Sequence, residues 1–175
     1  MKIKRILSAA TVALVWTTSA TAGPVYTFSV SEGTQPSNAG VITLTQSGTN
    51  SVIVGVDLLP TYGFINTGGP HTPFAFNLAG TGALSIAFTA PLNGIYGSGM
   101  FSMNTAGGAN TPYGTFGVAI DSSAGNGSGK GYFGDLLFTL TRVGGLDTND
   151  FVRNLDNAPI VGGSYFSADL SDGRN

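Results

Sequence analysis

The stretch from Ser51 to Leu58 limits the fold of this chain more than any other. Its alternate side chains are apolar, namely Val52, Val54, Val56 and Leu58. A period of two residues is that of an extended strand with one buried face, whereas a helix repeats its apolar residues every three or four positions. Pro60 ends the strand, and a Gly-rich corner leads to a second apolar segment at Phe74–Leu78. The pattern therefore predicts strand, corner and strand.

Similar alternating segments recur along the chain. They lie at residues 26–30, 41–45, 84–88, 116–120, 136–140 and 164–170. A long Gly-rich connection is expected at 92–112, and one helical turn at 146–154, where Asp147 can cap the turn and Phe151 can pack inward. Turn residues separate the other segments roughly every ten positions. We therefore expect an all-β fold, an antiparallel, jelly-roll-like β-sandwich of about eight or nine short strands with long Gly-rich loops.

The N-terminus has the three parts of a secretory signal peptide. Basic residues precede an apolar run at 6–16, and Ala20-Thr21-Ala22 supplies small residues for cleavage. The apolar run is shorter than the roughly 20 residues that a membrane-spanning helix needs. We expect residues 1–22 to be removed on export to the periplasm, the cell surface or the medium. Residues 23–175 then form a single β-sandwich domain, and a truncation at its C-terminus is left open.

The composition limits the cellular compartments and the binding partners that are expected for this chain. The chain has no cysteine, so disulfides are excluded, and export without disulfides is typical of bacterial proteins. The expected mature chain has four basic and nine acidic residues, a net charge of −5. Its basic residues are scattered, at Lys130, Arg142, Arg153 and Arg174. Nucleic-acid binding requires such residues to cluster, so we expect no nucleic-acid partner, and we expect no integral membrane anchor in the mature chain.

His71 is the only histidine and therefore the only candidate base of a Ser-His-Asp triad. It lies between two prolines, and the chain contains no Gly-x-Ser-x-Gly motif. We interpret His71 as a turn residue whose ring bonds to nearby backbone. One histidine without cysteine also cannot supply an ordinary zinc site. We predict no catalytic residue, no cofactor and no metal site.

Oxygen-bearing side chains gather at Asp147, Asn149 and Asp150. Calcium prefers oxygen ligands, but the segment lacks the Gly and the distant Glu of an EF-hand loop. Helix capping explains the same residues and is favoured, with calcium as the alternative. The loop 124–131 differs from a phosphate-binding loop in the spacing of its glycines and in lacking Ser or Thr after its lysine. Glu32 is the only glutamate, so no glycosidase-type carboxylate pair can be identified.

Several aromatic residues lie in or beside turns, where an exposed ring could stack on a sugar. They are Tyr62, Phe64, Tyr96, Tyr113 and Tyr132. Aromatic side chains carry much of the buried area of a core, so we favour core positions for these rings. A coplanar set on one exposed sheet face would instead indicate a carbohydrate-binding module.

Three segments together resemble a known family. They are QSGTNSVIVGVDLLPTYGFINTGGPHTPFAFNL at 46–78, DLLFTLTRVGGLDTNDFV at 135–152 and YFSADLSDG at 165–173. With the export signal, they are similar to the ectodomains of PEP-CTERM exported proteins of Gram-negative bacteria. The resemblance implies an exosortase substrate associated with extracellular polysaccharide and biofilm matrix, and it brings no catalytic or binding residue with it. The sequence departs from that family in lacking the Val-Pro-Glu-Pro-like signal, apolar helix and basic tail.

These expectations favour a non-catalytic structural or interaction protein of the cell surface or extracellular matrix. Extracellular polysaccharide or another matrix component is the expected partner. A carbohydrate-binding module is the alternative, and a secreted hydrolase is less favoured. Sandwiches host many functions, so the fold by itself does not separate these classes. The sequence identifies no ligand-binding residue.

Overall fold

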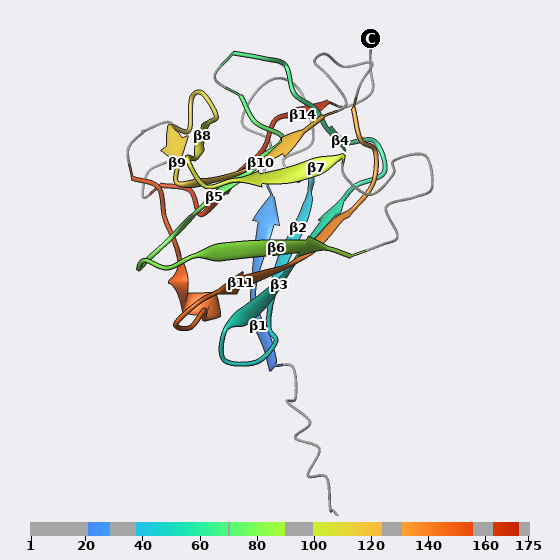
Figure 1. Cartoon of the computed structure of the whole chain (residues 1–175). Coiled ribbons are helices and arrows are strands. Elements are labelled where there is room, and N and C mark those ends of the chain that lie inside the picture. The colour runs from blue at the N-terminus through green and yellow to red at the C-terminus, as the bar shows by residue number, and fades with distance from the viewer. Residues whose placement is uncertain are drawn as a thin grey trace, which may run out of the picture.

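The computed structural model describes residues 21–28, 38–69, 71–89, 100–123, 131–155 and 163–171. Two antiparallel sheets pack face to face around an apolar core (Figure 1). Several sequence expectations concern residues outside the described ranges: the signal segment up to residue 20, Glu32, Tyr96, the loop 124–130 and Arg174. No helix in the described part of the chain is long and apolar enough to cross a membrane.

The first sheet has five strands in the order β1-β2-β3-β11-β6. Their bounds are β1 (Thr21–Phe28), β2 (Gly40–Gln46), β3 (Ser51–Leu58), β11 (Leu136–Arg142) and β6 (Leu84–Phe88). The first three strands are consecutive, and β11 then joins β3 with Val54 opposite Phe138. All the pairs are antiparallel, so one face of this sheet can be apolar along its whole width.

The second sheet is assembled from shorter strands in the order β12-β5-β10-β7, with β13 also pairing with β5. Their bounds are β5 (Phe74–Leu78), β7 (Phe101–Asn104), β10 (Val118–Ser122), β12 (Phe151–Val152) and β13 (Phe166–Ser167). Two small sheets complete the fold, β4 (Gly63–Phe64) with β14 (Leu170–Ser171) and β8 (Gly108–Ala109) with β9 (Thr115–Phe116). The chain crosses repeatedly between the two large sheets, as in a jelly roll.

The predicted all-β antiparallel sandwich is confirmed. Eight strands have four or more residues, in agreement with the expected number, and the other six described strands have two residues each. The segment 164–170, predicted to be one strand, is split between β13 and β14, and Phe116 belongs to β9 rather than to the strand that follows. Strand β1 begins at Thr21, two residues before the expected mature N-terminus, so the cleavage remains a prediction.

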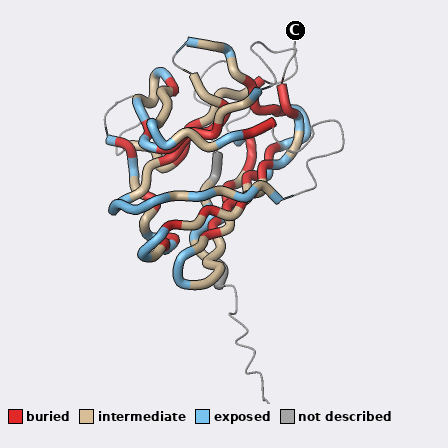
Figure 2. The backbone as a smooth tube through the Cα atoms, viewed as in Figure 1, coloured by how far each residue is buried: buried red, intermediate tan, exposed pale blue. Residues whose placement is uncertain are grey.

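The core lies between the two sheets and is rich in aromatic rings. The predicted alternation in β3 is confirmed, because Val52 and Val54 are fully buried and Asp57 is exposed. Figure 2 shows the buried positions along the facing sides of the sheets. Phe74 stacks on Phe166 at 5.8 Å, and each buried ring of this kind contributes about 1.5–3 kcal/mol.

The predicted helical turn is a short 3-10 helix, η2 (Thr148–Asp150), capped by Asp147. The side chain of Gln46, at the end of β2, connects this turn to the first sheet. Its amide nitrogen donates to the Leu146 carbonyl at 2.7 Å, and its amide oxygen accepts from the Thr148 N–H at 3.1 Å. Phe151, which directly follows the turn, is buried as predicted.

Candidate functional site

Most of the aromatic residues considered for sugar stacking lie in the core. Tyr62, Phe64 and Tyr132 are all buried, and Phe64 stacks on Tyr132 with a centroid separation of 6.5 Å. The favoured core position is therefore confirmed for these three, and an exposed stacking role for them is wrong. Tyr113 is half-buried. The backbone groups of Phe64 and Tyr132 exchange hydrogen bonds, and this pairing is the physical reason why these two rings are buried.

His71 is half-buried at the start of the segment leading into β5. Within the described ranges its ring makes no hydrogen bond or ion pair, so the expected bond to nearby backbone is not seen there, and neither is a contact with a serine or a carboxylate. The structure therefore does not assemble a triad around His71 from the residues it describes.

The capping role of Asp147 and Asp150 is confirmed. The Asp147 carboxylate accepts from the Asn149 N–H at 2.8 Å, and the Asp150 carboxylate accepts from the Asp147 N–H at 2.8 Å. Asp150 also forms an ion pair with Arg142 at 2.5 Å. Among the described residues, no group of three His, Cys, Asp or Glu side chains is placed to hold a metal ion.

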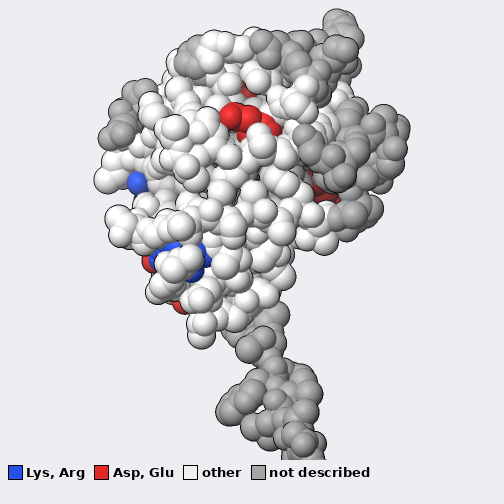
Figure 3. Space-filling view, viewed as in Figure 1, with Lys and Arg blue, Asp and Glu red and all other residues white. Residues whose placement is uncertain are grey.

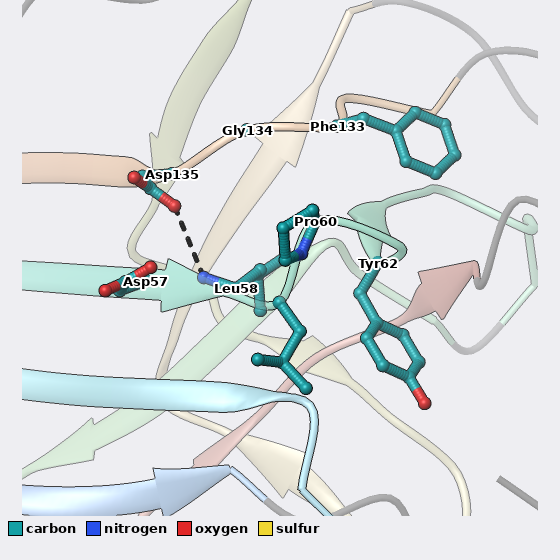
Figure 4. A pocket seen from close by; sticks show the side chains of 8 residues that line it. Asp57, Leu58, Pro60, Tyr62, Phe133, Gly134 and Asp135 are labelled. Carbon is teal, nitrogen blue, oxygen red and sulfur yellow. Dashed lines mark hydrogen bonds between the residues drawn. The ribbon is translucent and has the colours of Figure 1, made fainter. Parts of the chain in front are cut away.

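An open pocket of about 340 Å³ lies where β3 ends and β11 begins. It is lined by Asp57, Leu58, Leu59, Pro60, Tyr62, Phe133, Gly134 and Asp135. Figure 4 shows two carboxyl groups on one side of Pro60 and the rings of Phe133 and Tyr62 on the other. The pocket thus has an acidic end and an aromatic end.

The acidic end is a cross-strand pair of carboxylates. Leu136 pairs with Val56 in the β3–β11 ladder, which brings the preceding Asp135 opposite Asp57. One Asp135 oxygen accepts from the Leu58 N–H at 3.3 Å. Partial burial raises the pKa of the Asp135 carboxyl above its ordinary value, the negative charge of Asp57 raises it further, and the Leu58 N–H opposes the rise. Asp135 therefore takes up a proton more readily than an isolated aspartate does.

The aromatic end is formed by Phe133, whose side chain is 42% exposed. Two glycines allow its ring to lie close to the backbone. A Cβ atom at Gly63 would approach the Phe133 ring to 2.8 Å, and one at Gly131 would approach it to 2.9 Å. Leu59, also on the pocket wall, is 41% exposed. The exposed ring is therefore held in place by main chain rather than by a surrounding core.

The pocket combines hydrogen-bond acceptors with an exposed ring, a pairing suited to a ligand that carries hydroxyl groups and an apolar face. Asp57 and Asp135 lie opposite each other across the β3–β11 ladder, and both can accept hydrogen bonds from such a ligand.

Sequence analysis did not identify Asp57, Phe133 or Asp135 as site residues. The available signal was a carboxylate at the end of one alternating segment and another directly before a second such segment. The sequence does not say that the two strands are neighbours, because 77 residues separate Leu58 from Asp135. The pairing of β3 with β11 alone brings the residues together.

The charged groups elsewhere on the described surface are sparse. Figure 3 shows a face on which neither acidic nor basic atoms form an extended patch. Two of the four basic residues of the expected mature chain are described: Arg142 forms the ion pair with Asp150, and Arg153 lies 5.0 Å from the ring centroid of Tyr165. No family model, no curated protein and no solved structure matches this chain.

Proposed function

We propose that the mature chain is an exported, non-catalytic interaction protein of the cell surface or extracellular matrix, with extracellular polysaccharide as its partner. The signal-like N-terminus supports export, and the similarity to PEP-CTERM ectodomains supports an association with polysaccharide and biofilm matrix. The sparse surface charge agrees with a partner that is bound by hydrogen bonds and ring contacts rather than by ion pairs.

The observation that carries the proposal is the open pocket between Asp135 and Phe133. Sugars present hydroxyl groups, which donate hydrogen bonds to carboxylates, and C–H faces, which pack on aromatic rings. Asp57 and Asp135 supply the acceptors, and the exposed Phe133 ring supplies the apolar surface. A single exposed ring provides a weak contact with each sugar. It is therefore better suited to repeated binding along a polymer than to tight binding of one sugar.

A carbohydrate-binding module is the second candidate, and the same pocket favours it. The two candidates differ in ligand size. A module binds a soluble oligosaccharide saturably, whereas a matrix protein retains measurable affinity only for the polymer, where many weak contacts add.

The test is sedimentation of the purified mature chain with insoluble neutral polysaccharides, together with calorimetry on soluble oligosaccharides. We expect Phe133→Ala to raise the dissociation constant for the polymer about fivefold, which corresponds to the loss of about 1 kcal/mol of ring contact. Val143→Ala is the matched control, because Val143 is an exposed apolar residue that directly follows β11, at the end away from the pocket. His71→Ala is expected to bind like the wild type.

Three results would overturn the proposal. The first is no binding to any polysaccharide of a broad panel, and the second is equal binding by Phe133→Ala and the wild type. The third is release of reducing ends from a glycan that is lost in Asp135→Asn, which would make the chain a hydrolase. Saturable binding of an oligosaccharide would decide in favour of the binding module.

A further inference from the structure

Strand β6 forms one edge of the first sheet, and half of its backbone groups face outward. The Thr89 N–H donates to the Leu137 carbonyl at 2.9 Å, and the Val143 N–H donates to the Ala83 carbonyl at 3.1 Å. Bonded and non-bonded pairs alternate in an antiparallel ladder, so the odd-numbered residues of β6 bond to β11. The N–H and C=O groups of Leu84, Ile86 and Phe88 therefore point to the free edge, where no described residue bonds to them.

This edge lacks the features that normally prevent strands from pairing between molecules. Proteins protect their edges with charges, prolines, bulges or very short strands. Strand β6 has five residues, regular pairing and none of these features. The chain carries no Asp, Glu, Lys or Arg from residue 58 to residue 120, so the neighbouring segments are also uncharged.

The opposite edge of the same sheet is protected. Strand β1 contains Pro24, which has no N–H to donate, and its pairing with β2 shifts between Ala22 and Val25 as in a bulge. The edge strands of the second sheet are four residues long in β7 and two residues long in β12 and β13. Among the described edges, β6 is therefore the one best able to accept another strand.

The side chains behind this edge are incompletely covered. Leu84, Ile86 and Phe88 point toward the core but are only half-buried, and Met103 on β7 is half-buried beside them. Figure 1 shows β6 crossing the front of the molecule. A strand added along β6 would cover this apolar row and satisfy the outward backbone groups in one step.

We propose that β6 pairs antiparallel with β6 of a second copy of this chain, around a twofold axis at Ile86. In this register Leu84 lies opposite Phe88 of the second copy, so apolar side chains meet apolar side chains across the axis. On the other face, Ser85 lies opposite Ala87 of the second copy, and both are small and exposed. The two first sheets then form one continuous sheet.

The charge distribution favours a second copy as the occupant. Strand β6 itself carries no charge, and the charged residue opposite it on β11, Arg142, is buried and ion-paired with Asp150. Two identical edges therefore approach without like charges facing each other at the junction, and isologous pairing needs no second complementary sequence. A five-residue edge buries less area than a standard interface, so the association is expected to be weak and concentration-dependent. This inference is independent of the polysaccharide pocket, which lies at the end of β3.

The first experiment measures amide hydrogen exchange by NMR at increasing concentration of the mature chain. We expect exchange at Ile86 and Phe88 to slow as dimer forms, because their N–H groups bond only in the dimer. Thr89 is the internal control, since its N–H already bonds to Leu137 in the monomer. Exchange at Ile86 that does not depend on concentration, from the micromolar to the millimolar range, would overturn the proposal.

The second experiment introduces charged residues into β6 and measures dimerisation of the variants by analytical ultracentrifugation. In the proposed register, Ser85→Lys combined with Ala87→Lys sets like charges opposite each other, and we expect dimerisation to weaken by about tenfold or more. Ser85→Asp combined with Ala87→Lys sets opposite charges across the axis and should restore it. Val25→Lys with Leu155→Lys adds the same charge at exposed positions away from β6 and should leave association unchanged.

The three variants separate a specific edge contact from a general effect of charge. Circular dichroism and thermal unfolding check that each variant is folded. Equal association by the two β6 variants, or a loss caused equally by the Val25 and Leu155 control, would overturn the pairing. A wild-type chain that stays monomeric at millimolar concentration would also overturn it.

Discussion

The charged side chains at the two ends of strand β11 lie in opposite electrostatic environments. At its C-terminal end Arg142 is buried, forms an ion pair with Asp150 and donates from its Nε to the Gly145 carbonyl at 2.6 Å. Its Nη1 donates to the Ala79 carbonyl. At the other end Asp135 faces a second carboxylate, that of Asp57, beside an open pocket. Arg142 thus faces a group of opposite charge, whereas Asp135 faces a group of like charge.

This difference separates a structural cluster from a candidate site. Charges that are buried and fully hydrogen-bonded hold elements together, and Arg142 connects β11, the loop after β5 and the turn η2. A like-charged pair across two strands costs stability, so its presence beside a pocket is more simply explained by a ligand than by the fold. The three predictions below test this contrast.

The largest effect is expected at the Arg142 end. Arg142→Met removes the cation, which leaves the Asp150 carboxylate without its ion-pair partner and the Ala79 and Gly145 carbonyls without the Arg142 donor. Breaking one side of a buried ion pair costs roughly 3–5 kcal/mol, and the partial exposure of Asp150 places the expected loss near the lower value, about 3 kcal/mol. The measurement is urea unfolding of wild type and variant at neutral pH.

Arg153→Met is the matched control for that prediction, because Arg153 is exposed and packs on Tyr165. Its expected loss is about 0.5 kcal/mol, the size of an exposed cation–π contact. If both variants lost the same stability, the contacts of Arg142 would not form a structural cluster.

An intermediate effect of opposite sign is expected at the Asp135 end. The pKa of Asp135 is raised in the folded state, so ionising this carboxyl costs stability at pH values above the raised pKa. The cost disappears below the ordinary aspartate pKa, where the carboxyl is protonated in both states. Both carboxyls are exposed and therefore screened by water, so Asp135→Asn should be more stable than the wild type by only about 0.5 kcal/mol at pH 7 and equal to it in acid.

The difference between the two unfolding curves, measured from acid to neutral pH, checks this prediction. Asp135→Ala serves as the comparison, because Asn keeps an oxygen that can accept from the Leu58 N–H and Ala does not. Asn is expected to be the more stable of the two variants. A wild type that gained stability relative to Asp135→Asn as the pH rises would show that the two carboxylates do not repel each other.

The smallest effect on stability is expected at the aromatic end of the pocket. Gly131→Ala would bring a Cβ atom to 2.9 Å from the Phe133 ring and 3.0 Å from the Ile65 side chain, so the ring must turn. Both neighbours are side-chain atoms, the exposed Phe133 ring can move aside, and the added methyl group also restricts the unfolded chain, so the expected net loss of stability is below about 0.5 kcal/mol. Polysaccharide binding should fall with little change in unfolding. Unchanged binding would mean that the position of the Phe133 ring does not affect polysaccharide binding.

The regularity of the elements decided how much could be predicted. Where large apolar residues alternate over seven or more positions, as in β3 and β11, the strand and its more buried face follow from the sequence, because every second side chain lies on the same face. The capping by Asp147 was also predictable, since it depends on residues three positions apart. The two-residue strands were not, because their backbone pairing is set by distant partners.

By itself the sequence determined the all-β class, the alternating strands and the capped turn at Asp147. These are local properties that depend on residues a few positions apart. Only the tertiary structure decided that β11 lies between β3 and β6, and hence that Asp135 meets Asp57 and that β6 is left at an edge. Strand order depends on which apolar faces pack together across the whole domain, and no short segment carries that information.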